Sequence, residues 1–175
     1  MPASDLAGAK SVIEWAALDS PVGTLYLAAS GKGLRSVCFE HHWEARRRRL
    51  SPGGGAEWLR ADDPAGAASA LARYFEGELD APCGLEARPE GSAFQQDVWA
   101  SLRQVPAGAT VTYAQLATTS GHPRAARAVG GAMAANPLAV VVPCHRVVAA
   151  GGGPGGYGGG RQAKAWLLGH ERRFA

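Results

Sequence analysis

Acidic residues are almost absent from the second half of this 175-residue chain. No Asp or Glu lies between Asp97 and Glu171, and residues 92–175 carry eight basic side chains against two acidic ones. Residues 1–91 instead carry 10 basic and 13 acidic side chains. A long segment with positive charge only attracts polyanions such as nucleic acids. The same pattern also arises in a chain that is merely rich in Gly and Ala, so charge alone leaves the question open.

Long apolar runs and a cysteine framework are lacking too. No apolar stretch reaches the roughly 18 residues of a transmembrane helix. Residues 1–10 have no basic segment followed by an apolar run, so no signal peptide is expected. The three cysteines are far apart and odd in number, which argues against disulfides. We therefore expect a cytoplasmic protein with no membrane partner, built as one sizeable domain or two small ones.

The N-terminal part, residues 1–89, is predicted to form a small antiparallel sheet followed by a helix. Turn-forming clusters separate three apolar runs, at 12–18, 24–29 and 34–39. Helical spacing in residues 65–76 places Leu71, Tyr74 and Phe75 on one inner face. The arginines at 46–49 are expected in a solvated surface loop, with DNA contact as the alternative.

Residues 90–175 are predicted to be mostly helical. Ser92 caps a helix to about Gln104, and two shorter helices joined by a Gly-His-Pro turn give a helix-turn-helix over about 112–135. The second of these helices, from about Arg124 to Ala135, consists almost entirely of small residues. Such a surface suits close approach to a narrow groove with one inserted arginine, Arg127, while tight helix packing is the alternative.

A valine-rich run from Val140 to Val148 is interrupted by a Cys-His-Arg triplet. A buried strand that ends in a turn at Pro143 explains the valines but not the triplet. Cys144 is either a small core residue or a nucleophile, because positive neighbours such as His145 and Arg146 lower the pKa of a thiol.

Several spaced motifs accompany this triplet in a fixed order. They are Phe94-Gln95, Val98-Trp99, Pro106-x-Gly108, Tyr113 with Leu116-Ala117, Arg127-Ala128-Val129-Gly130, Asn136-Pro137, Pro143-Cys144-His145-Arg146-Val147, Gly156-Tyr157-x-Gly159-Gly160, and Lys164, Leu167-Leu168 and Glu171. With these motifs the chain resembles the O6-alkylguanine-DNA alkyltransferases, also called methylated-DNA–protein-cysteine methyltransferases. Ser20-Pro21-x-Gly23 and the strands after it resemble the family's N-terminal domain more loosely.

The resemblance implies an α+β fold with a ribonuclease-H-like sheet in residues 1–89 and a DNA-binding, alkyl-transfer domain in residues 90–175. It implies direct-reversal repair, in which an alkyl group moves irreversibly from O6-alkylguanine, and from O4-alkylthymine, to a cysteine. The partner would be double-stranded DNA bound through the minor groove, with the damaged base flipped out. Each molecule would act once, as a monomer and without a cofactor or metal.

Catalytic roles follow from the resemblance at four positions. Cys144 would attack the alkyl carbon, and His145 would act as its base through a water, oriented by Glu171. Tyr113 would donate a proton toward the leaving guanine and press on a nearby phosphate.

The resemblance also assigns DNA-contact and pocket positions. Arg127 would fill the gap left by the flipped nucleotide, and Arg146 would be structural, tying the domains together. The other DNA contacts would be Tyr113, Arg124, Ala126 and Gly130. The substrate pocket would be formed by Met133, Asn136, Val147, Val148, Tyr157, Gly158 and Lys164.

Some features depart from the family pattern or favour other readings. Gly158 stands where several relatives have serine, which would alter hydrogen bonding to O6 or tolerance for larger alkyl groups. Cys38, His41 and His42 lack a fourth ligand at convincing spacing, so a zinc site is not expected. A damage-binding module, a Cys–His hydrolase and a small DNA-binding regulator are the alternative functions, and each leaves part of the motif set unexplained.

Overall fold

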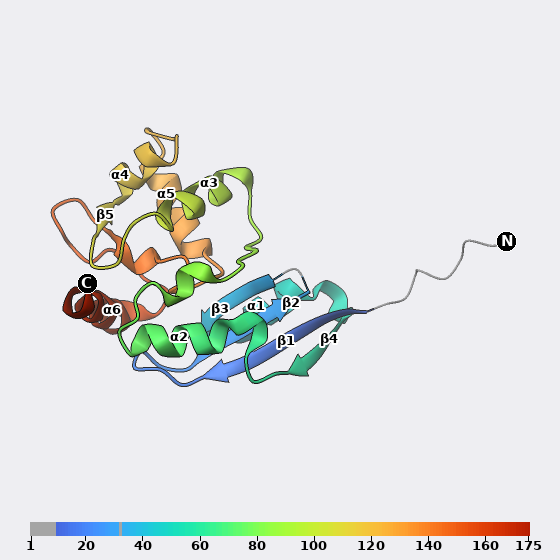
Figure 1. Ribbon diagram of the computed structural model, residues 1–175. Helices are drawn as coiled ribbons and strands as arrows, with labels where there is room; N and C mark the ends of the chain where they lie inside the picture. Colours follow the sequence, from blue (N-terminus) through green and yellow to red (C-terminus); the bar gives the residue numbers. More distant parts are fainter. Residues whose placement is uncertain (1–9, 32) are drawn as a thin grey trace.

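The computed structural model describes residues 10–31 and 33–175 and has an α+β architecture (Figure 1). A sheet with two helices forms the N-terminal part, and a group of helices forms the C-terminal part. The expectation about a signal peptide concerns residues that lie outside the described range except for Lys10. No helix within the described ranges is long and apolar enough to cross a membrane.

The sheet contains four strands in the order β3-β2-β1-β4. The predicted antiparallel meander corresponds to β1 (Ser11–Leu18), β2 (Leu25–Ser30) and β3 (Gly33–Phe39). A fourth strand, β4 (Ala56–Arg60), was not predicted from the sequence and pairs in parallel with β1. This short edge strand has three exposed residues out of five, so it lacks the apolar alternation that marked the other strands.

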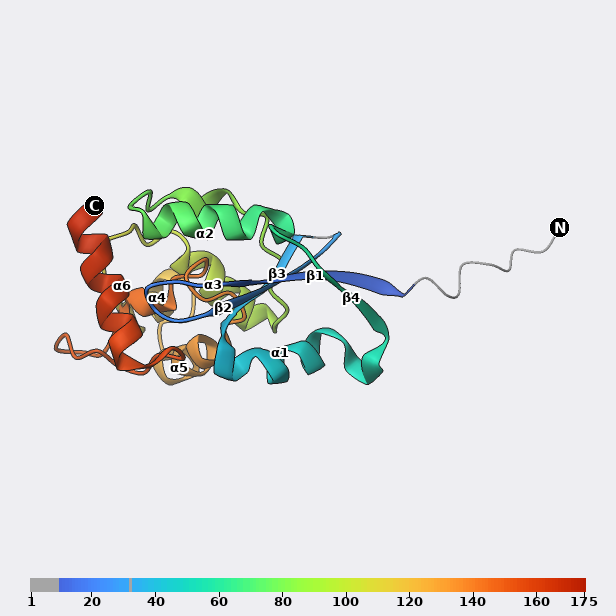
Figure 2. The same cartoon turned by 90° about the horizontal axis from the view of Figure 1, so that it is seen from below.

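Two helices cover opposite faces of the sheet (Figure 2). Helix α2 (Ala67–Phe75) packs on the face formed by Leu25 and Leu27, and α1 (Trp43–Leu50) lies on the face formed by Ile13 and Ala28. Successive strand residues point to opposite faces, so each strand contributes to both cores.

The expectation of a surface loop at residues 46–49 was wrong, because these arginines belong to α1. Trp43, with 8% of its surface exposed, anchors this helix on the sheet. Arg47, Arg48 and Arg49 are exposed and Arg46 is half-buried. The helix lacks the apolar periodicity of a typical amphipathic helix, since one tryptophan supplies most of its buried surface.

The C-terminal helices begin where the sequence provides caps. Helix α3 (Ala93–Leu102) and helix α4 (Tyr113–Thr119) each start with a capping box, formed by Ser92 with Gln95 and by Thr112 with Gln115. Such a box satisfies two backbone N–H groups that a helix start leaves free. The remaining elements are α5 (Ala126–Ala135), α6 (Gly160–Phe174), a two-stranded ladder of β5 (Val111–Thr112) with β6 (Val147–Val148), and short 3-10 turns at Glu40–His42, Pro52–Gly54, Pro64–Gly66, Ala81–Gly84 and Cys144–Arg146.

Strand β3 joins the two parts of the chain through its outer edge. The Val37 N–H donates to the Pro137 carbonyl at 2.9 Å, and the Ala139 N–H donates to the Val37 carbonyl at 2.9 Å. Near the start of the strand, Leu34 exchanges backbone hydrogen bonds with Glu86 and Arg88, each 2.8 Å. An edge that would otherwise expose unpaired backbone groups is therefore covered from both halves of the sequence.

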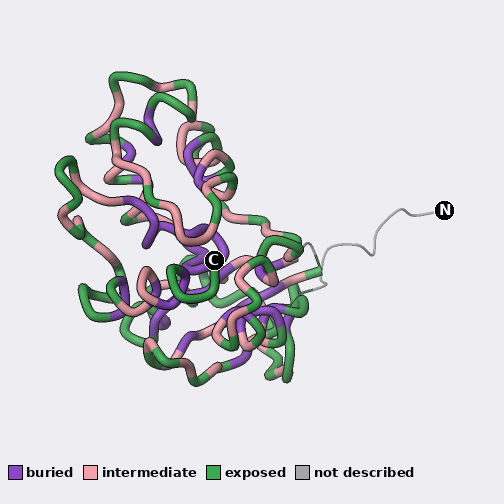
Figure 3. The backbone as a smooth tube through the Cα atoms, turned by 60° about the vertical axis from the view of Figure 1, so that its left-hand side comes forward, coloured by how far each residue is buried: buried purple, intermediate pink, exposed green. Residues whose placement is uncertain are grey.

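The predicted strand over the valine run is absent. Residues 137–147 are all buried, yet they form turns and one 3-10 turn, and only Val147–Val148 is a strand. Figure 3 shows the buried stretches of the backbone in purple. Val140 has a φ of 70°, a left-handed conformation that is rare for a β-branched residue. Burial on all sides produced the apolar run, and periodicity alone does not separate such a segment from a buried strand.

The two parts also meet through side chains of α2 and α6. The Tyr74 hydroxyl donates to Glu171 Oε1 at 2.8 Å, and His170 Nε2 lies 2.7 Å from the Tyr74 carbonyl oxygen. Tyr74 is 1% exposed and Glu171 is fully buried. The contact between α2 and α6 is therefore specified by polar groups in a dry environment.

Tyr74→Phe is expected to lower the free energy of unfolding by about 1–3 kcal/mol, because the buried carboxylate of Glu171 loses a donor. The measurement is urea denaturation monitored by circular dichroism. Tyr26→Phe is the matched control, since no described residue hydrogen-bonds the Tyr26 hydroxyl. Equal stability of Y74F and the parent protein would contradict the importance of this contact.

Candidate active site

Cys144 begins a single 3-10 turn, Cys144–Arg146, directly after Pro143. Its N–H donates to the Val142 carbonyl at 2.8 Å, which closes a tight turn before the cysteine. The residue is 9% exposed, and its sulfur reaches a cavity beside α5. A strand would place Cys144 and Arg146 on the same face. In the short turn, Cys144 reaches the cavity, whereas His145 and Arg146 both contact Glu171.

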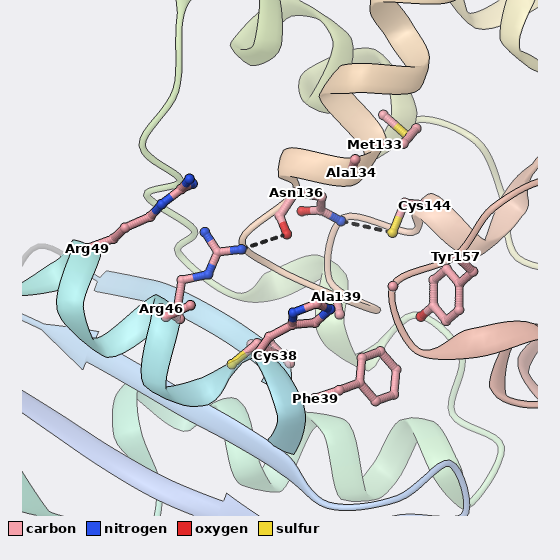
Figure 4. Close-up of a pocket in the computed structure, with 14 residues that line it drawn as sticks. Cys38, Phe39, Arg46, Arg49, Met133, Ala134, Asn136, Ala139, Cys144 and Tyr157 are labelled. Atoms are coloured by element: carbon pink, nitrogen blue, oxygen red, sulfur yellow. Dashed lines mark hydrogen bonds between the residues drawn. The ribbon is translucent and has the colours of Figure 1, made fainter.

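Asn136, the residue after α5, holds this turn in place (Figure 4). Its side-chain Nδ2 donates to the Val142 carbonyl at 2.9 Å and to Cys144 Sγ at 3.1 Å. Its Oδ1 accepts from the Leu138 N–H at 2.9 Å. One amide side chain thus fixes the path of the chain from α5 to the cysteine.

His145 and Glu171 form a buried pair behind the cysteine. His145 Nε2 lies 2.7 Å from Glu171 Oε1, and both side chains are fully buried. The other ring nitrogen, Nδ1, is buried and has no hydrogen-bond partner in the described part of the protein. Burial lowers the pKa of His145 despite the neighbouring carboxylate, so the ring is neutral near pH 7.

The Glu171 carboxylate accepts hydrogen bonds from four residues. Besides Tyr74 and His145, it accepts from Arg146 Nε at 3.0 Å and Nη2 at 2.8 Å, and from the Gly108 N–H at 3.2 Å. Burial favours a higher pKa for Glu171, but the hydrogen bonds from His145 and Arg146 and the charge of the Arg146 guanidinium outweigh it and hold the pKa well below its usual range. The carboxylate is therefore ionised near neutral pH.

Arg146 was expected to tie the two domains together. Its described hydrogen bonds go to Glu171 and to the Val105 carbonyl, both in the C-terminal part. The contact that crosses to the N-terminal part is made by Tyr74 on the same carboxylate. Helical spacing predicted Tyr74 only as a core residue. Its hydrogen bond to Glu171 was not predicted, because the two residues lie 97 positions apart in the sequence.

The thiol of Cys144 experiences opposing influences. Burial raises its pKa, while the hydrogen bond from Asn136 and the positive charge of Lys164 lower it, and the net direction is upward. The resting form is consequently the neutral thiol. Formation of the thiolate needs a base close to Sγ at the moment of reaction.

A cavity of about 320 Å³ adjoins the Cys144 sulfur. Five of the predicted site positions line it together with Cys144: Tyr113, Gly130, Met133, Tyr157 and Gly158. His42 and Gly156 also line this cavity, and neither was predicted as a pocket residue. The Tyr157 hydroxyl is buried without a hydrogen-bond partner in the described part of the chain.

Four predicted pocket positions do not line this cavity: Asn136, which holds the cysteine turn, and Val147, Val148 and Lys164. Lys164, 1% exposed, donates to the Val147 carbonyl at 2.5 Å and to the Gly156 carbonyl at 3.5 Å. Val147 and Val148 pair with β5. These residues support the loop that carries Tyr157, and Gly159 in that loop has no room for a Cβ because the Phe39 ring occupies the space.

The predicted DNA-contact residues gather on α5 and at the start of α4. Arg124 and Arg127 are exposed, and Ala126 is half-buried. A Cβ on Gly130 would lie 4.0 Å from the Tyr113 ring, so the two helices approach closely there. The outward surface of α5 consists of Arg127, Ala128, Gly131 and Ala134.

His41 and His42 do not gather with Cys38 into a metal site. Within residues 10–31 and 33–175, no group of three His, Cys, Asp or Glu side chains is placed to hold a metal ion. His41 Nε2 instead lies 2.9 Å from the Gly158 carbonyl, so the two histidines connect the end of β3 to the pocket loop.

Comparison with known proteins agrees with this geometry. The family model for the DNA-binding domain of 6-O-methylguanine DNA methyltransferase matches residues 93–173, and the model for its ribonuclease-like domain matches residues 13–85. The methylated-DNA–protein-cysteine methyltransferase of Mycolicibacterium paratuberculosis is 43% identical over 165 residues, covering 94% of this chain and 95% of the relative. The enzyme of the same name from Salmonella typhimurium is 41% identical, with 87% and 91% covered.

The fold comparison gives the same result. The crystal structure of Mycobacterium tuberculosis OGT in complex with DNA superposes with a TM-score of 0.74 at 38% identity, covering 94% of each chain. Family models cover both parts of the sequence, and relatives above 40% identity extend over most of its length. The chain belongs to the methylated-DNA–protein-cysteine methyltransferase family.

Proposed function

We propose that this protein repairs DNA by direct reversal, transferring the alkyl group of O6-alkylguanine to Cys144. The observation that carries the proposal is the position of the Cys144 sulfur at the wall of a cavity, with the buried His145–Glu171 pair directly behind it. A nucleophile, a base and a group that orients the base are the parts that nucleophilic catalysis requires.

The damaged base enters the cavity after it leaves the helix stack. O6 of guanine is inaccessible to a protein nucleophile inside a duplex, so the nucleotide must be flipped, at a cost of a few kcal/mol. Tyr157 and Met133 present apolar surface to the base, and the free Tyr157 hydroxyl bonds one of its polar edges. The same pocket accepts O4-alkylthymine, whose alkyl oxygen has similar chemistry.

Proton transfer runs through His145. Its Nε2–H donates to the ionised Glu171, which leaves the lone pair on Nδ1 to accept a proton. A water between this buried Nδ1 and Cys144 takes the thiol proton as sulfur attacks the alkyl carbon. The S–C bond forms and the O6–C bond breaks. The electron pair goes to guanine, and Tyr113, which lines the cavity, provides the proton that leaves guanine neutral.

The small outward face of α5 fits the minor groove of duplex DNA. Ala128, Gly131 and Ala134 add little bulk to the exposed helix surface, which lets its backbone approach the sugar-phosphate walls. Arg127 projects from the same surface and fills the gap left by the flipped nucleotide. The small residues therefore serve DNA contact on this face, and Trp99, which donates to the Ala132 carbonyl at 3.0 Å, serves packing on the opposite one.

The reaction ends in a thioether on Cys144, a bond that water does not hydrolyse under physiological conditions. Each molecule therefore acts once. We also expect it to act as a monomer and without a cofactor.

The two domains divide near residue 89, between the sheet with its helices and the C-terminal group. The expected result is one repaired guanine for each protein molecule.

Cys144→Ala is expected to abolish alkyl transfer and to leave DNA binding nearly unchanged, because the sulfur contributes reactivity and little contact area. Intact-protein mass after mixing with excess duplex carrying O6-methylguanine measures transfer, and fluorescence anisotropy measures binding. Cys83→Ala, at an exposed cysteine, is the control and should gain one methyl like the parent protein. A methyl group on any residue other than Cys144 in the parent protein would refute the assignment, and repeated turnover would favour a hydrolase.

The acid limb of the transfer rate is expected below the ordinary histidine pKa of about 6.5, because burial keeps His145 unprotonated to lower pH. Unfolding free energy should also fall in acid, since the unfolded chain takes up protons at His145 and Glu171 that the folded chain does not. Rates measured between about pH 8 and 5 test the first statement, and urea midpoints measured between about pH 8 and 3 test the second. His122→Gln, at a partly exposed histidine, should leave the profile unchanged; a midpoint above 6.5 would contradict it.

Arg127→Ala is expected to slow transfer from duplex DNA by about tenfold or more, because the flipped state loses the group that fills its gap. The rate with the free base O6-methylguanine should change less than about twofold, since no stack is broken there. Arg73→Ala, an exposed arginine of the N-terminal part, is the control. Equal losses on duplex and free base would argue against a role in base flipping.

A further inference from the structure

A second cavity, of about 220 Å³, opens from Cys144 toward the N-terminal part (Figure 4). Cys144, Met133 and Tyr157 are shared with the base cavity, so the sulfur lies where the two cavities meet. The far side is formed by the end of β3 and by α1, from which Arg46 and Arg49 reach toward the cavity. The proposed reaction with O6-methylguanine does not use this space.

The charge in this second cavity is positive and has no local counter-ion. Arg46 and Arg49 supply this charge, and no Asp or Glu among the described residues lines the cavity. His42 also lines it, but burial lowers its pKa, so its ring adds no charge near pH 7. Arg46 is half-buried, and burial lowers the pKa of its guanidinium. Its one described hydrogen bond goes from Nη2 to the Asn136 carbonyl at 3.3 Å. A guanidinium has five N–H donors, so most of those of Arg46 are available to an anion.

Arg46 is linked to the nucleophile through a single residue, Asn136. Asn136 accepts from Arg46 at its backbone carbonyl and donates to Cys144 Sγ at 3.1 Å through its side chain. Arg46 and the Cys144 sulfur are therefore bridged by one residue, and both line the second cavity. Val37 and Phe39 supply an apolar wall along the same path, which suits methylene groups.

The geometry of substitution directs alkyl substituents sideways. In an in-line displacement, sulfur, carbon and O6 are collinear, and the other groups on the carbon lie roughly perpendicular to that line. With guanine in the base cavity and sulfur at its wall, a substituent on the carbon must leave along a neighbouring space. The second cavity is such a space, and it begins at the sulfur.

We propose that this second cavity is a subsite for O6-alkyl groups that end in a carboxylate, with Arg46 and Arg49 as the specificity-determining residues. The inference rests on the proposed alkyl transfer and deepens it. The reaction itself is unchanged: the S–CH2 bond forms, the O6–CH2 bond breaks, the thiol proton passes through water to His145, and Tyr113 provides the proton that leaves guanine neutral. The carboxylate stays on the transferred group, paired with the arginines, and accepts charge-assisted hydrogen bonds from them.

The test compares duplexes that carry O6-carboxymethylguanine, its neutral amide isostere O6-carbamoylmethylguanine, and O6-methylguanine. Rates come from quenched reactions followed by intact-protein mass. The parent protein should transfer the carboxymethyl group about tenfold faster than the carbamoylmethyl group, as expected from a charge-assisted contact. Dividing each rate by the rate for methyl removes any effect of a variant on the nucleophile or on DNA affinity.

Arg46→Gln and Arg49→Gln should each reduce the acid-to-amide ratio, and the double variant should bring it to about one or below. Arg48→Gln is the matched control, because it removes the same charge from the same helix at a position outside the cavity. An unchanged ratio in the double variant, an equal fall in R48Q, or a parent ratio of one or less would overturn the subsite. Failure of methyl transfer itself would instead refute the proposed function, so the two failures are distinguishable.

Discussion

The rest of the site depends on one buried carboxylate. Glu171 has no exposed surface and is satisfied by Tyr74, His145, Arg146 and the Gly108 backbone. An ionised carboxylate in a dry interior is tolerated only when donors surround it, and removing any donor leaves charge uncompensated. These partners come from α2, the 3-10 turn at Cys144–Arg146 and the loop before α4, so satisfying Glu171 positions three separate elements around α6.

Polar contacts at the edge of the sheet reinforce the same arrangement. Strand β3 binds residues 137–139 through its backbone, and Asn136, just before them, bonds the Cys144 sulfur. The N-terminal sheet is therefore part of the support of the nucleophile, although the nucleophile lies in the C-terminal part. Because of this connection, Arg46 of α1 lies beside Asn136, the residue that bonds the Cys144 sulfur.

Electrostatics separates the resting state from the reacting state. Burial raises the pKa of Cys144 and lowers that of His145, so the resting site holds a thiol and a neutral imidazole. Such a site is unreactive toward most electrophiles in solution, since the thiolate is the effective nucleophile. Proton transfer to the imidazole is favoured by the fixed negative charge of Glu171, which stabilises the imidazolium as it forms.

The sequence by itself determined the elements whose signals are local. Capping residues located α3 and α4, turn clusters separated the first three strands, and the spaced motifs around Cys144 predicted the family. Tertiary structure decided what depends on distant partners. The valines at 140–142 are buried in turns because residues from both halves enclose them. Arg46 reaches the second cavity because α1 places its guanidinium beside the Asn136 carbonyl, and Tyr74 meets Glu171 across 97 positions. Periodicity and spacing describe one segment at a time, whereas burial and hydrogen bonding are set by the segments that surround it.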